Sequence, residues 1–248
     1  MSPFDLSGRK ALVTGANTGL GQGIAVALAE AGADIVAVGR SAPDETAEIV
    51  KKAGRTLQSI KADLGSVGPI KAVMEQIEGP IDILINNAGM IRRNDAIDFT
   101  EEDWDAVMDV NLKSAFFLSQ AVARRMIAEK RPGKIINIAS MLSFQGGIRV
   151  ASYTSSKSDI LGLTRLLANE WAAKGINVNA IAPGYFVTNN TEALRQDQKR
   201  SAEILGRIPA GRWGKPSDLG GAAVFLASAA SDYVNGAVLP VDGGWLAR

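Results

Sequence analysis

The sequence contains no histidine and no cysteine among its 248 residues. Without cysteine the chain has no disulfides and no thiolate metal ligands, and without histidine it also lacks the commonest ligands of zinc. We therefore expect no metal centre. Imidazole and thiol groups are also the usual proton carriers near neutral pH, so any catalysis must depend on other side chains.

The chain also has no marked excess of charge and no long apolar run. Its 27 basic and 26 acidic side chains give a formal net charge of +1, which argues against nucleic acid or an anionic membrane as a partner. No apolar run approaches the roughly 18 residues of a membrane span, and residues 1–10 show no secretory signal. Together with the absence of cysteine, this predicts a soluble, cytoplasmic protein that acts on a small molecule.

Apolar segments of strand type alternate with amphipathic helical segments along the whole chain. The predicted strands are residues 10–15, 34–40, 57–63, 82–89, 134–140, 176–184 and 237–244. Most are apolar on both faces, which is typical of a parallel sheet covered by helices on each side. We predict an α/β fold with one doubly wound Rossmann-type domain over residues 1–248, in which helices flank a seven-stranded parallel sheet on both faces.

Three segments between the strands are informative. Thr100 followed by Asp103 is a helix-opening pattern, and it predicts a long helix that runs to about residue 128. A second long helix is predicted over residues 152–173. Residues 188–216 form a polar insertion, which in a compact domain is usually either disordered or a lid over the functional site. We predict a lid.

A glycine-rich loop follows the first predicted strand. Residues 14–21 read TGANTGLG and lead directly into a helix. Glycines let the backbone approach a pyrophosphate, whose charge is favoured by the N-terminus of the next helix. A bare strand-to-helix turn would also use glycines, but strand, turn and helix here follow in the order that dinucleotide binding requires. The predicted binding residues are Gly15, Asn17, Thr18, Gly19, Leu20 and Gly21.

The second predicted strand ends at Gly39, Arg40 and Ser41. An acidic residue there would bind the adenosine 2′-hydroxyl of NAD, whereas Arg40 can pair with a 2′-phosphate and Gly39 leaves room for it. This predicts NADP as the cofactor, with NAD as the alternative; without such a role Arg40 would be an exposed loop arginine. Asp63 and Leu64, after the third strand, are predicted either to contact the adenine or simply to end the strand.

Tyr153 and Lys157 are the candidate proton-transfer pair. Residues four apart on a helix share one face, so these side chains are expected to lie next to each other. A neighbouring ammonium stabilises phenolate and lowers the pKa of tyrosine from its ordinary value near 10. Ser140 ends the fifth strand, at the edge where open α/β sheets bind ligands, and could hold a substrate oxygen. Taken alone, the Tyr–Lys spacing also fits an incidental surface pair.

Together these segments resemble the short-chain dehydrogenase/reductase family over the whole chain. Residues 14–21 match its TGxxxGxG loop, residues 86–89 its NNAG element, and residues 183–184 its turn after the sixth strand. The catalytic tetrad of the family is matched in full by Asn111, Ser140, Tyr153 and Lys157. The resemblance implies an NAD(P)-dependent oxidoreductase that forms a homotetramer.

The resemblance also implies a role for each matched residue. Tyr153 would be the general acid/base, and Lys157 would lower its pKa and hold the nicotinamide ribose. Ser140 would orient the substrate, and Asn111 would anchor a water relay to Lys157. The other cofactor contacts implied are Asn87, Ala88, Gly89, Pro183, Gly184 and Thr188.

Four segments, residues 139–158, 182–191, 207–219 and 231–248, resemble a narrower bacterial group. This group comprises the 2-deoxy-D-gluconate 3-dehydrogenases and 2-dehydro-3-deoxy-D-gluconate 5-dehydrogenases, which act on sugar acids. Two other functions remain open. A 3-oxoacyl-[acyl-carrier-protein] reductase would need a basic patch for its carrier protein, and a non-catalytic dinucleotide sensor would have no need of Tyr153.

A sugar acid carries a carboxylate, which a water-excluded cleft normally binds with arginine. We predict Arg149 for this role, because it lies on the loop between Ser140 and Tyr153. Arg92 and Arg93 are the alternatives. The further predicted substrate contacts are Gln145, Tyr185 and Asn189.

Overall fold

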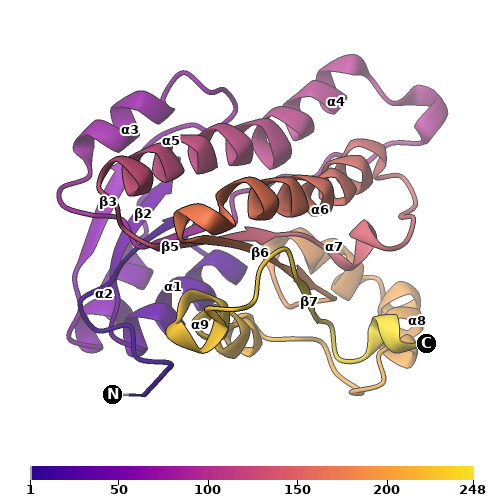
Figure 1. Cartoon of the computed structure of the whole chain (residues 1–248). Helices are drawn as coiled ribbons and strands as arrows, with labels where there is room; N and C mark the ends of the chain where they lie inside the picture. Colours follow the sequence, from indigo (N-terminus) through magenta and orange to yellow (C-terminus); the bar gives the residue numbers. More distant parts are fainter. Residues whose placement is uncertain (1) are drawn as a thin grey trace.

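The computed structural model describes residues 2–248, which form one seven-stranded sheet with every strand parallel to its neighbours (Figure 1). The strand order is β3-β2-β1-β4-β5-β6-β7. The bounds are β1 (Lys10–Thr14), β2 (Asp34–Gly39), β3 (Leu57–Lys61), β4 (Ile83–Asn86), β5 (Gly133–Ile138), β6 (Ile176–Pro183) and β7 (Val238–Val241). The predicted fold is confirmed. Most strands end earlier than predicted, because the residues at their carboxyl ends leave the sheet and form the loops of the site.

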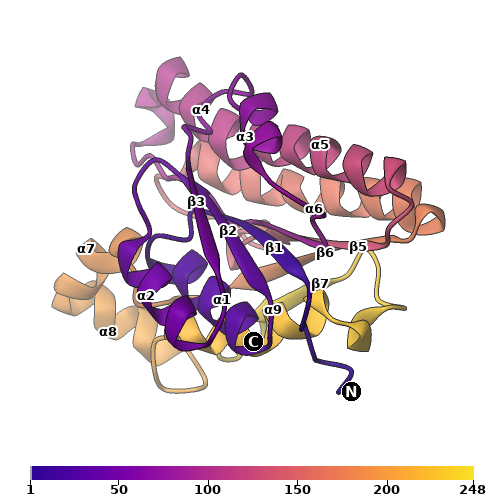
Figure 2. The same ribbon diagram turned by 90° about the vertical axis from the view of Figure 1, so that its left-hand side faces the viewer.

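Helices cover both faces of the sheet (Figure 2). One layer contains α1 (Gly19–Glu30), α2 (Asp44–Lys52) and α9 (Gly220–Ala227), and the other contains α3 (Ile70–Gln76), α4 (Glu101–Met108), α5 (Ser114–Ala128) and α6 (Ala151–Trp171). Adjacent residues of β1 pack into opposite layers: Val13 shares a core with α1 and α9, and Leu12 shares a core with α5 and α6. Burial on both sides explains why the central strands are apolar at nearly every position.

The helix predicted from Thr100 to residue 128 is interrupted once. Thr100 caps α4 as predicted, because its side chain accepts a hydrogen bond from the Asp103 amide at 3.2 Å. A π-helical turn (η2, Asp109–Lys113) then precedes α5. The hydrophobic period of the sequence does not reveal this turn. The π-helical turn contains Asn111, whose side chain forms hydrogen bonds with the backbone of Met90, in the loop after β4.

The second predicted helix is present as α6, 21 residues long, and a short 3₁₀ turn after it ends at Gly175, which has a φ of +79°. Leu167 and Trp171 on α6 pack into the core beneath α5. No helix within residues 2–248 is both long and apolar enough to cross a membrane.

The segment predicted as a lid contains two short helices, α7 (Glu192–Gln196) and α8 (Gln198–Arg207). On α8, Ile204 packs with Met141 and Trp245 in a small apolar cluster that is separate from the two main cores. Met141 directly follows Ser140. Residues 188–216 therefore contact the loop that carries the predicted catalytic serine.

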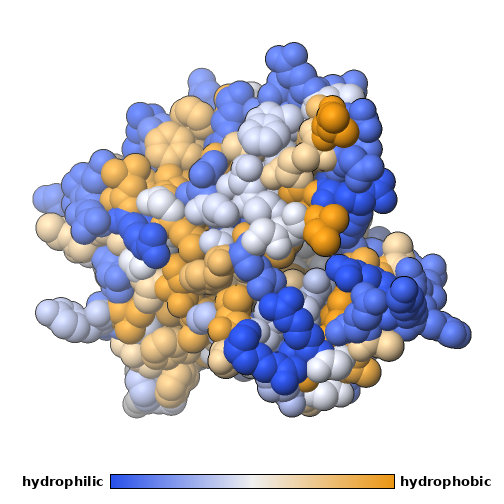
Figure 3. Space-filling model, turned by 90° about the vertical axis from the view of Figure 1, so that its right-hand side faces the viewer, coloured by the Kyte–Doolittle hydropathy of each residue, from blue (hydrophilic) through white to orange (hydrophobic). Residues whose placement is uncertain are grey.

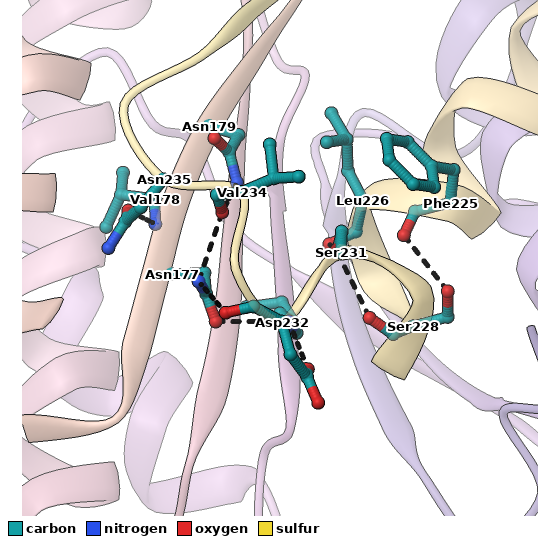
Figure 4. Close-up of polar contacts among 11 residues, drawn as sticks. Asn177, Val178, Asn179, Phe225, Leu226, Ser228, Ser231, Asp232, Val234 and Asn235 are labelled. Atoms are coloured by element: carbon teal, nitrogen blue, oxygen red, sulfur yellow. Dashed lines mark hydrogen bonds and ion pairs between the residues drawn. The ribbon is translucent and has the colours of Figure 1, made fainter. Parts of the chain in front are cut away.

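Strand β6 carries asparagines among its apolar residues, and Figure 4 shows Asn177 and Asn179 beside the segment that precedes β7. Both donate from Nδ2 to the Val234 carbonyl, at 3.0 and 2.9 Å, and Asn177 also donates to the Asp232 carbonyl at 3.0 Å. These side-chain bonds hold the segment that leads into β7. In the sheet formed by residues 2–248, β7 lies at the edge and pairs only with β6.

Candidate active site

The loops after β1, β2, β3, β4, β5 and β6 enclose two adjoining cavities at the carboxyl edge of the sheet. The larger, about 330 Å³, lies between the glycine-rich loop, the start of α6 and residues 188–191. The smaller, about 180 Å³, lies toward the end of β2. Gly15, Asn17, Ala88 and Gly89 line both, so the two cavities form one continuous cleft.

A larger cavity, about 590 Å³, lies at the opposite edge of the sheet. Its charged side chains pair with one another or with close neighbours: Asp82 binds Arg131 at 2.8 Å, and Lys134 binds Asp232 at 2.8 Å. Because these charged side chains already pair with each other, they are less available to bind a ligand than the side chains of the cleft at the carboxyl edge. We therefore locate the candidate site in the cleft.

The glycine-rich loop has the backbone shape that the prediction requires. Gly15 and Gly19 adopt φ angles of +68° and +58°, which favour glycine. A Cβ atom at Gly21 would lie 2.1 Å from the Gly15 carbonyl oxygen, so a larger residue would push the loop apart. Thr18, the N-cap of α1, makes no side-chain cap bond, which leaves amides of the first helical turn for an anion.

Thr14, at the end of β1, ties this loop to the segment after β4. Its Oγ1 accepts hydrogen bonds from the amides of Asn87 and Ala88, at 3.0 and 2.8 Å, and Asn87 Nδ2 donates to the Thr14 carbonyl at 2.9 Å. Asn86 points the other way and donates to side chains in the interior. The sequence patterns did not single out Thr14, although it is the first letter of the TGxxxGxG match.

Ser140, Tyr153 and Lys157 line the larger cavity together. Ser140 is the N-cap of a 3₁₀ turn (η3, Met141–Ser143), and its Oγ accepts a hydrogen bond from the Leu142 amide at 3.1 Å. Lys157 Nζ lies 5.8 Å from the centroid of the Tyr153 ring. The structure thus brings together the three residues that the sequence suggested for proton transfer.

The pKa of Tyr153 is raised above its ordinary value of 10.0 by burial, and hydrogen bonding with Ser140 and the positive charge of Arg93 oppose this rise without reversing it. The net direction is opposite to the one expected from the Tyr–Lys spacing. Desolvation of the phenol, which spacing alone does not reveal, is the larger effect. Tyr153 is therefore a neutral phenol at neutral pH and can donate a proton.

Lys157 is 5% exposed, and burial lowers its pKa to about 8. Its Nζ donates one hydrogen bond to the Ile138 carbonyl at 2.6 Å. An ammonium group has three hydrogens to donate, so two remain for a ligand in the cavity that Lys157 lines. The hydroxyls of a ribose fit this need, and the site as a whole fits a dinucleotide.

Asn111 lies behind the cavity wall. Its Oδ1 accepts a hydrogen bond from the Met90 amide at 2.8 Å, and its Nδ2 donates to the Met90 carbonyl at 3.0 Å and to Ser156 Oγ at 3.1 Å. Ser156 in turn donates to the Tyr153 carbonyl at 2.9 Å. Asn111 therefore holds α6 next to Lys157, and the water relay stays a prediction.

The smaller cavity is lined by the four residues predicted for the adenosine end of the cofactor: Arg40, Ser41, Asp63 and Leu64. Arg40 is exposed and makes no ion pair within residues 2–248, so its guanidinium is free to meet a phosphate. Asp63 accepts a hydrogen bond from the Gly65 amide at 2.9 Å, which supports the simpler role of ending β3.

The predicted contacts Pro183, Gly184, Thr188 and Asn189 also line the larger cavity. Three predicted substrate residues do not, and Arg149 is one of them. Gln145 lies outside both cavity walls, and Tyr185 packs between Trp213 and Trp245, at ring-centroid distances of 5.4 and 4.8 Å. Tyr185 faces the apolar cluster under α8, because its ring gains more from aromatic neighbours than from the polar cleft.

Arg149 also lies outside both cavity walls, so the structure does not support it as the carboxylate partner. Its guanidinium pairs with Asp95 at 3.0 Å on the surface, where the side chain is 57% exposed. Arg92 is likewise paired, with Asp103 at 3.2 Å. The sequence could not show that a neighbouring loop neutralises each of these arginines.

Arg93 is the arginine that remains. It has no carboxylate partner within residues 2–248, and it donates to the Asn190 carbonyl at 3.2 Å. Its positive charge also opposes the rise in the pKa of Tyr153, which shows that the guanidinium lies close enough to act on that phenol. Asn190 lines the larger cavity, so Arg93 contacts a residue of the cavity wall, although its own side chain is not part of that wall.

Comparisons with known proteins point to one family. A sequence model of the family described as enoyl-(acyl carrier protein) reductase matches residues 15–246. The whole chain is 62% identical to 2-dehydro-3-deoxy-D-gluconate 5-dehydrogenase of Escherichia coli (strain K12), 99% of which is covered. A protein of the same name from Bacillus subtilis (strain 168) is 57% identical, with 99% of this chain and 97% of that protein covered.

A solved structure agrees with these relatives. The crystal structure of a candidate 2-deoxy-D-gluconate 3-dehydrogenase from Agrobacterium tumefaciens, with bound NADP, superposes with a TM-score of 0.96. The two sequences are 62% identical, and both chains are covered completely.

The buried ammonium of Lys157 predicts a specific pH dependence of stability. Its pKa is about 8 in the folded chain against an ordinary 10.5, so the unfolded chain binds more protons between these pH values. The free energy of unfolding therefore rises with pH across this window, by about 3 kcal/mol from this group. We expect Lys157→Met to remove this rise, as measured by urea unfolding of the cofactor-free protein from pH 7 to 10.

The matched control is Lys71→Met, because the Lys71 side chain is 87% exposed and its loss removes a lysine charge without removing a buried one. The unfolding free energy of the wild type minus that of Lys157→Met should increase as the pH rises. A difference that stays constant from pH 7 to 10 would mean that the ammonium is better solvated than its burial indicates.

Proposed function

Because this chain belongs to the short-chain dehydrogenase/reductase family, we propose that it transfers a hydride between NADP and a secondary alcohol or ketone of a deoxy sugar acid. The single observation that carries the substrate is the full-length identity to the E. coli enzyme. We assign the reaction of that relative, oxidation at carbon 5 of 2-dehydro-3-deoxy-D-gluconate. Oxidation at carbon 3 of 2-deoxy-D-gluconate is the second candidate, from the name of the Agrobacterium protein.

The shape and the donors of the cleft support NADP binding. The pyrophosphate would lie on the glycine-rich loop and the start of α1, and the ribose next to the nicotinamide would bind the free hydrogens of Lys157. Arg40 and Ser41 would meet the 2′-phosphate in the smaller cavity. Thr188 lines the other end of the cleft, where the carboxamide would lie.

Proton transfer would be carried out by the chain itself. A bound nicotinamide would supply the acceptor or donor of the hydride. Tyr153 gives its proton to the substrate carbonyl oxygen during reduction and takes it back from the alcohol during oxidation. Ser140 donates its hydroxyl hydrogen to the same oxygen. The ammonium of Lys157, 5.8 Å from the ring centroid, stabilises the phenolate left after proton donation.

The other functions considered have less support. An acyl carrier protein is acidic and would need free basic side chains at the cleft mouth, but Arg92 and Arg149 are each paired with an aspartate. A non-catalytic sensor would not need Ser140, Tyr153 and Lys157 to meet in one cavity. The dehydrogenase names of the full-length relatives agree with an enzyme.

We also propose that residues 188–216 act as a lid, and that the chain works in the cytoplasm as a homotetramer. The lid is supported by the small separate core under α8, which leaves this segment weakly held to the rest of the chain.

Association is supported by exposed apolar side chains, including Phe117 and Leu166 on α5 and α6. Figure 3 shows apolar residues exposed among charged ones on the side that carries α4, α8 and the C-terminus.

The substrate assignment is tested by turnover. We expect the wild-type enzyme with NADP to oxidise 2-dehydro-3-deoxy-D-gluconate faster than 2-deoxy-D-gluconate or gluconate, as followed by cofactor absorbance. Tyr153→Phe should lower kcat by roughly a hundredfold or more while NADP still binds, because only proton transfer is lost. Faster reduction of a 3-oxoacyl thioester than of the sugar acid's keto form would favour the acyl-carrier alternative.

The cofactor preference is tested at Arg40. A charge-assisted hydrogen bond to phosphate contributes about 1.5–3 kcal/mol, which corresponds to roughly a ten- to hundredfold change in affinity. Arg40→Ala should therefore weaken NADP binding by this factor and leave NAD binding nearly unchanged, as measured by titration of tryptophan fluorescence. Equal losses for both cofactors would show that Arg40 supports the loop and does not recognise the 2′-phosphate.

The carboxylate partner is tested by comparing two arginines. Arg93→Leu should raise KM for the sugar acid by at least about tenfold, or about 1.4 kcal/mol, and should leave KM for the uncharged amide of the same acid nearly unchanged. Arg149→Leu is the matched control, because it removes the same charge from an arginine that is already paired with Asp95. A larger effect at Arg149 than at Arg93 would reverse this assignment.

A further inference from the structure

Ser143 lies outside the catalytic tetrad but contacts the backbone of two of its members. Its Oγ accepts a hydrogen bond from the Ser140 amide at 3.2 Å and donates one to the Lys157 carbonyl at 2.5 Å. A single hydroxyl therefore joins the loop after β5 to α6 at Lys157. Both of its bonds connect segments whose relative position matters for the reaction.

These two bonds are part of a closed ring of contacts. Lys157 Nζ donates to the Ile138 carbonyl at 2.6 Å, and Ile138 is the last residue of β5, two positions before Ser140. The ring runs from the Ser140 amide through Ser143 to the Lys157 backbone, and then through the Lys157 side chain back to β5. Any movement of α6 relative to β5 strains one side of the ring.

The same turn also orients the Ser140 hydroxyl. The Leu142 amide donates to Ser140 Oγ, while Ser143 accepts from the Ser140 amide, so the two serines form a reciprocal capping box. The bond from Leu142 uses one lone pair of Ser140 Oγ and restricts its rotamer. Its hydrogen then stays available to the larger cavity, which Ser140 lines and Ser143 does not.

We propose that Ser143 is a positioning residue for the reaction. Its hydroxyl sets the distance between Ser140 and the face of α6 that carries Tyr153 and Lys157, and it does so from outside the cavity wall. This inference rests on the roles given above to the three tetrad residues, but not on the identity of the sugar acid. Catalytic groups that act on one oxygen must be held within a fraction of an ångström, so a lost tether should lower the rate more than it weakens binding.

The test is Ser143→Ala in the full-length enzyme. We expect kcat to fall roughly ten- to hundredfold, because a misplacement of about 1 Å has an effect of that size. The Kd for NADP, measured by tryptophan fluorescence, should stay within about twofold, since the glycine-rich loop and Arg40 are untouched. Ser143→Thr, which keeps the hydroxyl, should recover most of kcat.

Ser158→Ala is the matched control. Ser158 lies on α6, and its hydroxyl also donates to a carbonyl of that helix, that of Thr154 at 2.9 Å, but the side chain is exposed and this hydrogen bond does not involve a tetrad residue. Its replacement should leave kcat unchanged. If Ser143→Ala fails to fold, Ser143→Cys takes its place, because sulfur keeps the volume but forms weaker hydrogen bonds.

The assay uses whichever secondary alcohol the wild-type enzyme turns over best, so a wrong sugar acid affects the proposed function and not this test. Wild-type kcat in Ser143→Ala would overturn the positioning role. The role is equally overturned if kcat, NADP affinity and melting temperature fall together and Ser143→Thr restores none of them, since that pattern describes a purely structural serine.

Discussion

The buried ammonium of Lys157 is the interaction on which the rest of the site depends. Removing a charge from water is costly, and the lowered pKa of this group, about 8, records that cost. One carbonyl at the end of β5 accepts a hydrogen bond from it, and the remaining hydrogens face the cleft. A fold that served stability alone would place an apolar residue there.

The parallel sheet supplies the rigid frame for this charge. Segments far apart in sequence meet only because parallel strands end at the same edge, so that Thr14 after one strand can bind the amides that follow another. Most of the apolar core lies in two layers, one on each face of the sheet. The loops of the site therefore start from strands that are buried on both faces, and α8 rests on a separate small cluster that also contains Met141.

Charge pairing around the cleft determines which ligand the site can receive. Arg92 and Arg149 are neutralised by aspartates on neighbouring loops, whereas Arg40 at one end of the cleft and Arg93 at the other have no carboxylate partner in the described chain, residues 2–248. Under the proposed function, these two unpaired guanidiniums would meet the 2′-phosphate of the cofactor and the carboxylate of the sugar acid. Arg93 also opposes the rise in the pKa of Tyr153, so an anion bound to Arg93 would change the charge that this phenol experiences.

The sequence by itself determined the sheet, its helical layers and the glycine-rich loop, because these follow from local period, spacing and backbone preference. It indicated the tetrad only through the resemblance to a known family. Tertiary structure alone decided the direction of the Tyr153 pKa, which depends on desolvation by distant segments. It also decided the π turn at Asn111, the packing of Tyr185 against Trp245 instead of in the cleft, and the pairing of Arg149 with Asp95. In each case the deciding contact joins residues from different elements. A linear pattern records the residues that an element contains, but the neighbours of a side chain across the fold are fixed only when the whole chain packs.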